Sequence, residues 1–356
     1  MPDTYVYRRA EWAAQKASIM GWPGLNGTLK DYPDRLARAT EEVSRISVSI
    51  ANFQPVTVIV GAERMEEAQT HFAEVDTPFD IKVHRVEGDS SDIWTRDFAP
   101  TFVIQNGPGA ERSLVGLNLN FNGWGGRYPT PTNLALAQTF CRDMGINCKD
   151  ISIVTEGGSL ETDGEGTLLL TESSIHNDNR NPGKSREDIE HELVRAFGVE
   201  KVIWIPGRKG IDSRDCHIDS LVRFARPGVL LLSKANEVKK SDWTVVYEEA
   251  RDILSSATDA KGRPFDIVEV EEPDEDLFDG NGFDHSRPVR SYANFVLVNG
   301  GIILPQFGDP AHDAAAIRVA QRLFGDQRRI MPVLIEELPL LGSGAHSSTQ
   351  EIPLLP

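Results

Sequence analysis

The chain has 356 residues, of which 40% are hydrophobic and 26% are charged. This composition is typical of a globular protein with a sizeable core, and it excludes an intrinsically disordered chain. The formal net charge of -17 argues against nucleic acid or an anionic membrane as a partner, and it favours a small cationic ligand.

The first twelve residues contain no apolar stretch of the kind found in signal peptides, and no apolar run is long enough to span a bilayer. We therefore expect no membrane association and a cytoplasmic location. The three cysteines, Cys141, Cys148 and Cys216, are an odd number without metal-ligand spacing. This pattern favours a reducing compartment and buried thiols over a disulfide framework.

A unit of two apolar strands joined by a turn, then a helical stretch and another short strand, recurs along the chain. Two segments, ASIMGWP (17–23) and GSGAHSSTQEIP (342–353), lack a hairpin of their own, so we expect them to pair. The predicted hairpins span 101–109, 160–172, 221–233 and 295–305, with turns near Asn106, Asp163, Pro227 and Asn299. The helical stretches are predicted at Leu134–Met144, Arg186–Phe197, Trp243–Ser256 and Ala311–Phe324.

Pairing of the first and last segments would close these units into a ring, in which strand ends from different units converge on a central channel. A doubly wound sheet is the competing α/β fold. It lacks support because FNGWGG (121–126) does not have the spacing of a dinucleotide fingerprint and no Walker motif occurs, so we expect no nucleotide binding. No proline-rich or glycine-serine linker divides the chain, which predicts one domain over residues 1–356.

Polar and acidic residues lie directly before the strands of the repeated units, where only capping or turn residues would be expected. His217 and Asp219 are two apart in an expected strand, so their side chains should point to one face and meet one ligand. A satisfied structural pair is the alternative for these two. The four polar segments are 92–97, 156–159, 212–219 and 344–350.

Two further features each allow a structural and a functional interpretation. Glu156 precedes two glycines, which is typical of a turn carboxylate or of a place where a ligand approaches the backbone closely. Trp94 lies between Asp92 and Asp97, which fits either core packing or a flat cation held by stacking and paired hydrogen bonds.

Together these segments make the chain similar to the agmatine deiminase family, which is peptidylarginine-deiminase-like and belongs to the guanidine-modifying enzyme superfamily. The resemblance implies a five-unit pseudo-symmetric α/β propeller (the pentein fold) in a single domain, which agrees with the ring inferred above, and it allows a homo-oligomer. It covers essentially the whole chain, through the motifs AEW, MGWP, DIWTRD, NFNGWGG, EGGS, DGEGTLLLTES to NRNP, H-x-D, SYANF, PQFGD and STQEIP.

The resemblance also implies roles for individual residues. Asp97 and Asp219 would hold the guanidinium nitrogens, Glu156 would orient His217, and His217 would act as general acid and base. In such enzymes a cysteine thiolate attacks the guanidinium carbon, ammonia leaves, and water hydrolyses the covalent intermediate to a ureido product. This chemistry needs neither a metal ion nor an organic cofactor.

Residues flanking these groups are expected to bind the rest of a small cationic guanidino substrate. They are Trp94, Asp92, Asp212 and Arg214.

The chain departs from the family at the nucleophile. The C-terminal family motif is His, Cys, any residue, Thr, Gln, whereas this chain has Ser347 after His346. Serine is a poor replacement because its hydroxyl ionises far less readily than a thiol. A deliberate change that traps substrate is the favoured explanation, and a natural chain that binds without catalysis is the alternative. Cys216 neighbours His217 but should point to the opposite face.

A second departure concerns the substrate. The family typically has Asp-Glu-Thr-Asp-Gly-His where this chain has Asp212-Ser213-Arg214-Asp215-Cys216-His217. Loss of the glutamate and gain of Arg214 should weaken binding of a distal ammonium and could provide a partner for a carboxylate or carbonyl. The sequence therefore predicts an arginine derivative as substrate, such as a small linear or cyclic arginine-containing peptide. In the alternative, Arg214 faces solvent and agmatine remains the substrate.

Two other classes of protein stay open at this point. Metal-dependent hydrolysis could use His217, Asp219, Asp97 and Glu156 as ligands, although no recognisable metal motif is present. A non-catalytic protein that senses a guanidino ligand is the second alternative, and Ser347 is its support.

Overall fold

The computed structural model describes residues 5–88, 92–107, 111–236, 240–278, 282 and 287–356. The strands in this part of the chain form five sheets of three or four strands each. None of the helices described has both the length and the apolar character that crossing a bilayer requires.

Each sheet contains an antiparallel pair of strands extended by a parallel third strand. The first sheet also contains the edge strand β1 (Tyr5–Tyr7) and the fifth contains β4 (Ile81–Arg85). The recurring strands are β5 (Thr101–Asn106), β6 (Arg112–Asn118) and β7 (Asn147–Asp150); β8 (Glu161–Thr162), β9 (Thr167–Thr171) and β10 (Lys201–Ile205); β11 (Val222–Arg226), β12 (Val229–Lys234) and β13 (Asp266–Glu271); β14 (Val296–Val298), β15 (Gly301–Gln306) and β16 (Arg329–Leu334); and β17 (Thr349–Pro353), β2 (Gln15–Gly21) and β3 (Val56–Val60).

A long helix connects the second and third strand of every unit, because a parallel strand can be reached only through a crossover. These helices are α5 (Pro131–Asp143), α7 (Arg186–Phe197), α8 (Asp242–Ser256), α9 (Pro310–Phe324) and α1 (Pro33–Ile50). The order strand, strand, helix, strand therefore occurs five times, as the repeated unit in the sequence predicts.

The local sequence explains where these helices begin. Ser185 and Asp188 form a capping box at the start of α7, each side chain accepting a hydrogen bond from the other residue's backbone amide. Asp309 caps α9 by accepting hydrogen bonds from the amides of Ala311 and His312. The inward face of α1 buries Val43, Ile46 and Ile50 among other side chains. Each buried aliphatic side chain of this size contributes about 1.5–3 kcal/mol of transfer free energy.

The remaining helices are shorter. Three short elements matter for the site because each lies just before the first strand of a unit: α3 (Thr95–Phe98), η3 (Gly157–Ser159) and η4 (Ile218–Ser220). The full set of shorter helices is α2 (Met65–Ala73), α3 (Thr95–Phe98), α4 (Gly123–Gly126), α6 (Glu172–Ile175) and α10 (Glu337–Leu340), with 3-10 turns η1 (Ala62–Arg64), η3 (Gly157–Ser159), η4 (Ile218–Ser220) and η5 (Glu275–Leu277).

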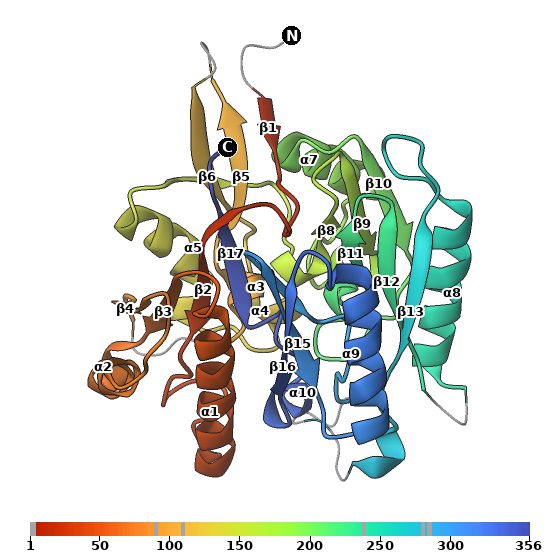
Figure 1. The fold of residues 1–356 in the computed structure, drawn as a ribbon. Helices are drawn as coiled ribbons and strands as arrows, with labels where there is room; N and C mark the ends of the chain where they lie inside the picture. Colours follow the sequence, from red (N-terminus) through yellow and green to blue (C-terminus); the bar gives the residue numbers. More distant parts are fainter. Residues whose placement is uncertain (1–4, 89–91, 108–110, 237–239, 279–281, 283–286) are drawn as a thin grey trace.

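The predicted pairing of the two ends of the chain is confirmed. β17 and β2 run antiparallel and side by side, with Gln350 opposite Ile19 (Figure 1). The four predicted hairpins and four predicted helices are present as well, although residues 108–110 in the first hairpin's connection lie outside the described residues. The predicted α/β fold class is therefore confirmed.

Candidate functional site

Short turns before the first strands of four of the five units meet at one buried place. α3 carries Asp97, Glu156 lies directly before η3, and His217 and Asp219 lie at η4. Ser347 precedes β17. Each of these five residues is at most 1% exposed. The structure therefore brings together the residues that the sequence predicts to be catalytic, as expected for units arranged about a common axis.

His217 lies between two carboxylates. Its Nδ1 atom is 3.7 Å from Oδ1 of Asp97, and its Nε2 atom is 3.4 Å from Oε2 of Glu156. Burial opposes the charged imidazolium, but the two carboxylates prevail and raise the pKa of His217 above its usual value. Among the described residues neither ring nitrogen has a well-aligned hydrogen-bond partner. The imidazole is thus fully buried, favoured in its protonated form, and free to exchange protons with a ligand.

The two carboxylates beside His217 have different surroundings. Asp97 accepts hydrogen bonds from the Trp124 indole at 2.9 Å and the Gly158 amide at 3.1 Å, yet burial raises its pKa. Glu156 accepts a hydrogen bond from Nε of Arg180 at 3.0 Å. Burial opposes the ionisation of Glu156, but the charge of this guanidinium group lowers its pKa. Glu156 is therefore the stable anion that can orient His217, whereas Asp97 has no paired guanidinium group among the described residues and only shares His217 with Glu156.

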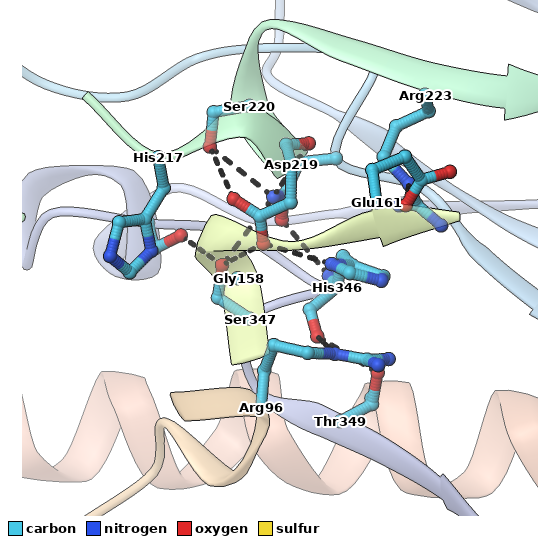
Figure 2. Close-up of polar contacts among 12 residues, drawn as sticks. Arg96, Gly158, Glu161, His217, Asp219, Ser220, Arg223, His346, Ser347 and Thr349 are labelled. Carbon is cyan, nitrogen blue, oxygen red and sulfur yellow. Dashed lines mark hydrogen bonds and ion pairs between the residues drawn. The ribbon is translucent and has the colours of Figure 1, made fainter. Parts of the chain in front are cut away.

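Asp219 and Ser347 share a hydrogen bond. The Ser347 hydroxyl donates to Oδ2 of Asp219 at 2.9 Å, and Nδ1 of His346 lies 2.8 Å from the same oxygen (Figure 2). Burial would raise the pKa of Asp219, but the hydrogen bond and charge of His346 and the charge of Arg214 hold it well below its usual range. Asp219 therefore stays ionised, and it contacts residue 347, where the family has its nucleophile.

Gly158 leaves room at the centre of these groups. A Cβ atom at this position would lie 2.7 Å from Nδ1 of His217, 2.8 Å from Oδ1 of Asp97 and 3.1 Å from Oδ2 of Asp219. Any larger residue would push these polar atoms apart. A close approach at the glycines after Glu156 was one of the two interpretations that the sequence allowed, and the structure shows that these three side chains make it at Gly158.

The expectation of a strand at His217 and Asp219 is wrong. Ile218–Ser220 forms a 3-10 turn, closed by a hydrogen bond from the Leu221 amide to the Ile218 carbonyl, because the chain must turn there to enter β11. Both side chains nevertheless approach Gly158, so the two side chains converge as expected, with a different local geometry.

The four residues predicted to bind the rest of the substrate are placed differently. Asp92, Trp94 and Arg214 line one pocket beside the buried cluster, together with Tyr128 and Ser213. Arg214 is only 3% exposed, so the alternative in which it faces solvent is wrong.

Asp212 is not among the residues that line this pocket. Its Oδ1 atom accepts hydrogen bonds from the backbone amides of Arg214, at 2.8 Å, and Cys216, at 3.0 Å. It therefore holds the turn that delivers His217 to the site.

Cys216 lies in the apolar core with Ile203 and Phe224, away from the polar cluster. It adopts a positive φ of 71°, and burial raises the pKa of its thiol. The prediction that Cys216 does not face the site is confirmed.

Several residues of the site were not predicted. Arg180 fixes Glu156, Trp124 fixes Asp97, and Asn294 contacts Ser347 through Nδ2 at 3.4 Å. His346 also contacts Glu11, with Nε2 at 2.9 Å from Oε2. These residues lie in motifs that the sequence analysis quoted, but only the fold shows which side chains they contact.

The metal alternative has little geometric support. In the described part of the chain, no three or more His, Cys, Asp or Glu side chains are grouped so that they could hold a metal ion. The carboxylates of the cluster instead accept hydrogen bonds from Trp124, Arg180 and Ser347.

Comparison with known proteins agrees with this site. The family model described as Porphyromonas-type peptidyl-arginine deiminase matches residues 7–353. An agmatine deiminase of Medicago truncatula is 34% identical and covers 97% of this chain and 96% of its own. An agmatine deiminase of Pseudomonas fluorescens (strain SBW25) is 37% identical, covering 97% of this chain and 94% of its own.

The solved structure of an agmatine deiminase of Enterococcus faecalis superposes with a TM-score of 0.82 at 27% identity, over 98% of this chain and 96% of that one. This likeness confirms the predicted pentein fold and the predicted resemblance to agmatine deiminases. By its fold, its motifs and the match over nearly its whole length, the chain belongs to the family of Porphyromonas-type peptidyl-arginine deiminases.

Proposed function

We propose that this site binds a guanidino compound and that its cysteine form hydrolyses the guanidino group to a ureido product and ammonia. One observation carries the proposal: Asp97, His217 and Asp219 surround a single point at Gly158, next to residue 347, and Glu156 lies on the other side of the His217 ring. Two carboxylates flanking a flat cation match the geometry of paired, charge-assisted hydrogen bonds. Relatives 34–37% identical to this chain are agmatine deiminases.

The steps follow from the positions of these groups. A thiolate at position 347 forms a bond to the central guanidinium carbon, and one C–N bond breaks as ammonia leaves with the proton of His217. His217 then takes a proton from water, whose oxygen bonds to the same carbon. The carbon–sulfur bond breaks, which releases the ureido product and regenerates the thiolate.

The serine at position 347 should stop this reaction at the binding step. A serine hydroxyl needs a base to become a nucleophile, and its partner here is Asp219, whose lowered pKa makes it a weak base. The raised pKa of His217 favours the protonated form of that side chain, which cannot act as a base. We therefore propose that the chain holds a guanidino ligand without turning it over, as an altered enzyme that traps substrate.

A natural non-catalytic binder is the second candidate, and the surroundings of Ser347 favour it. The hydroxyl of Ser347 donates to Asp219, and its oxygen lies within hydrogen-bond distance of donors on Ser343, on Arg214 at 3.3 Å and on Asn294 at 3.4 Å, two of which its lone pairs can accept. A serine is thus accommodated by its neighbours. The genomic codon for residue 347 distinguishes the two candidates, since a cysteine codon would establish the altered enzyme.

The enzymatic proposal is tested with Ser347→Cys. We expect this variant to release ammonia from at least one compound of a panel containing agmatine, arginine, N-acylated arginine and cyclic arginine dipeptides. Ser348→Cys is the matched control, because the neighbouring Ser348 is equally buried but donates its hydroxyl hydrogen bond to the Ala345 carbonyl. A folded Ser347→Cys variant that releases no ammonia from any of these compounds would overturn the proposal. Unchanged activity after chelation would exclude metal-dependent hydrolysis.

We propose an arginine derivative, rather than agmatine, as the ligand. The acid that lines the pocket, Asp92, already accepts hydrogen bonds from Thr28 at 2.9 Å and from the Ile93 amide at 2.7 Å, and burial raises its pKa. It therefore offers little to a distal ammonium, whereas Arg214 offers donors to a carboxylate or carbonyl. Isothermal titration of the Ser347 protein with agmatine and the arginine derivatives tests this, and tightest binding of agmatine would contradict it.

A further inference from the structure

The guanidinium group of Arg214 lies between the open pocket and the buried acid cluster. It lines the pocket, whereas Asp97, Glu156, His217, Asp219 and Ser347 do not. A ligand that enters from the pocket therefore meets Arg214 before it reaches the acids.

Arg214 also contacts the groups that a guanidino ligand would use. Its Nη1 atom donates to the Ser343 hydroxyl and to the Ser347 hydroxyl, at 3.3 Å from the latter, and lies 3.9 Å from Oδ1 of Asp219. Residue 347, the position of the nucleophile, and Asp219, one of the two carboxylates expected to hold a ligand guanidinium, thus already face a guanidinium group of the chain itself.

The binding of Arg214 in this position is incomplete. Its Nε and Nη2 atoms are buried and have no hydrogen-bond partner among the described residues, and the nearest acid to Nη2, Asp212, is 3.9 Å away. Buried donors without acceptors are costly, so this arrangement is weaker than a fully paired arginine. A ligand can therefore displace the side chain.

We infer that Arg214 is an internal competitor, whose guanidinium group must leave Asp219 and residue 347 before a guanidino ligand can bind there. The inference rests on the proposed function and deepens it by making Arg214 a determinant of affinity and specificity. Two guanidinium groups beside one carboxylate repel each other, so Arg214 opposes a second guanidinium group beside Asp219.

The displaced side chain has a consequence for the choice of ligand. If Arg214 moves towards the pocket, a ligand carboxylate or carbonyl there provides the acceptor that Nε and Nη2 lack. Agmatine carries no such group, so it displaces Arg214 without compensation. Removal of Arg214 should accordingly help agmatine more than it helps an arginine derivative.

The test compares agmatine binding by isothermal titration to the unchanged protein, Arg214→Thr and Arg208→Thr. Threonine is the residue that the agmatine deiminase motif has at this position. Arg208→Thr is the control, because it removes the same charge from a side chain paired with Glu249 outside the pocket. We expect agmatine to bind Arg214→Thr more tightly by about tenfold or more and Arg208→Thr unchanged. Arg214→Gln, which is larger and also uncharged, serves if the threonine variant does not fold.

The opposite outcomes are distinguishable. Equal or weaker binding to Arg214→Thr or Arg214→Gln would overturn the inference, and weaker binding would make Arg214 an anchor for the ligand. The proposed function is measured separately with Ser347→Cys and the double variant Ser347→Cys/Arg214→Thr. If both variants release ammonia from agmatine with the same KM, the inference is overturned but the proposed function stands. If neither variant releases ammonia and agmatine does not bind, the inference and the proposed function are both overturned.

Discussion

Glu11, near the start of the chain, lies 2.9 Å from His346, near its end, through Oε2 and Nε2. The same carboxylate pairs with the buried Arg223, and its other oxygen accepts a hydrogen bond from the Leu297 amide at 2.7 Å. His346 in turn contacts Asp219. Burial opposes ionisation of Glu11, but Arg223 and His346 hold its pKa well below the usual range. Glu11 is thus an anion on which the orientation of Asp219 depends.

We predict that Glu11→Gln lowers the free energy of unfolding by about 3–5 kcal/mol, because it leaves Arg223 and His346 buried with one anion fewer. Urea unfolding followed by fluorescence measures the change. Glu165→Gln is the matched control, since its ion pair with Arg263 is well exposed and should contribute no more than about 1 kcal/mol. Equal effects of the two substitutions would contradict the prediction.

The protonation of His217 should be visible in the stability of the protein. Its pKa is raised because Asp97 and Glu156 outweigh the opposing effect of burial. A histidine whose pKa is higher in the folded than in the unfolded state adds stability that is fully present below the unfolded value of about 6.5. This stability is lost as the pH rises through the folded pKa.

We therefore predict that the difference in unfolding free energy between the unchanged protein and His217→Gln is largest at or below about pH 6.5 and shrinks at higher pH. Denaturant unfolding over a series of pH values measures it. His191→Gln is the control, because His191 lies outside the cluster on the partly exposed face of α7. A difference that grows with rising pH would show that His217 is buried in its neutral form.

Much of the fold could be predicted because its signals are local. Turns such as the one at Asn299 and caps such as Ser185 act within a few residues, and the apolar runs beside them mark the strands. The convergence of the acids was predicted from the ring and from the family resemblance.

The orientation of particular side chains could not be predicted in this way. The direction of Arg214 depends on Ser343 and Ser347, more than a hundred residues away, and the contact between Glu11 and His346 joins the two ends of the chain. The wrong strand at His217 has a local cause, since period-two spacing of polar residues does not distinguish a strand from a 3-10 turn over three residues.

Gly158 should be essential for ligand binding. In Gly158→Ala the new Cβ atom would lie under 3.0 Å from both His217 and Asp97, so these side chains must move out of the positions that face the ligand. We predict that binding of a guanidino ligand weakens by about tenfold or more, as misplaced polar groups lose their hydrogen bonds. Isothermal titration measures the change.

The control for this substitution is Gly107→Ala, where the added Cβ would meet only the Glu111 carbonyl oxygen, at 3.6 Å. That variant should bind the ligand as the unchanged protein does. If Gly158→Ala also bound normally, the space above Gly158 would not be part of the ligand site, and the proposed position of the guanidinium group would be wrong.

The positive φ of Cys216, 71°, belongs to a region that glycine tolerates and other residues occupy at a cost of about 1–3 kcal/mol. The backbone is held there because the Cys216 amide donates to Asp212 at 3.0 Å and its carbonyl accepts from the Thr171 hydroxyl. These two hydrogen bonds involve only the backbone of residue 216, so a substitution there keeps them and the positive φ, and His217 stays in the site. The strain energy therefore depends on whether residue 216 has a Cβ atom.

We predict that Cys216→Gly is more stable than Cys216→Ala by about 1 kcal/mol, although glycine is ordinarily the less stabilising of the two residues. Both substitutions remove the buried sulfur, so the comparison isolates the Cβ atom. Thermal unfolding of the two variants measures the difference. A higher Tm for Cys216→Ala would show that the turn before His217 carries no backbone strain, and that the cysteine here needs no compensation from Asp212 and Thr171.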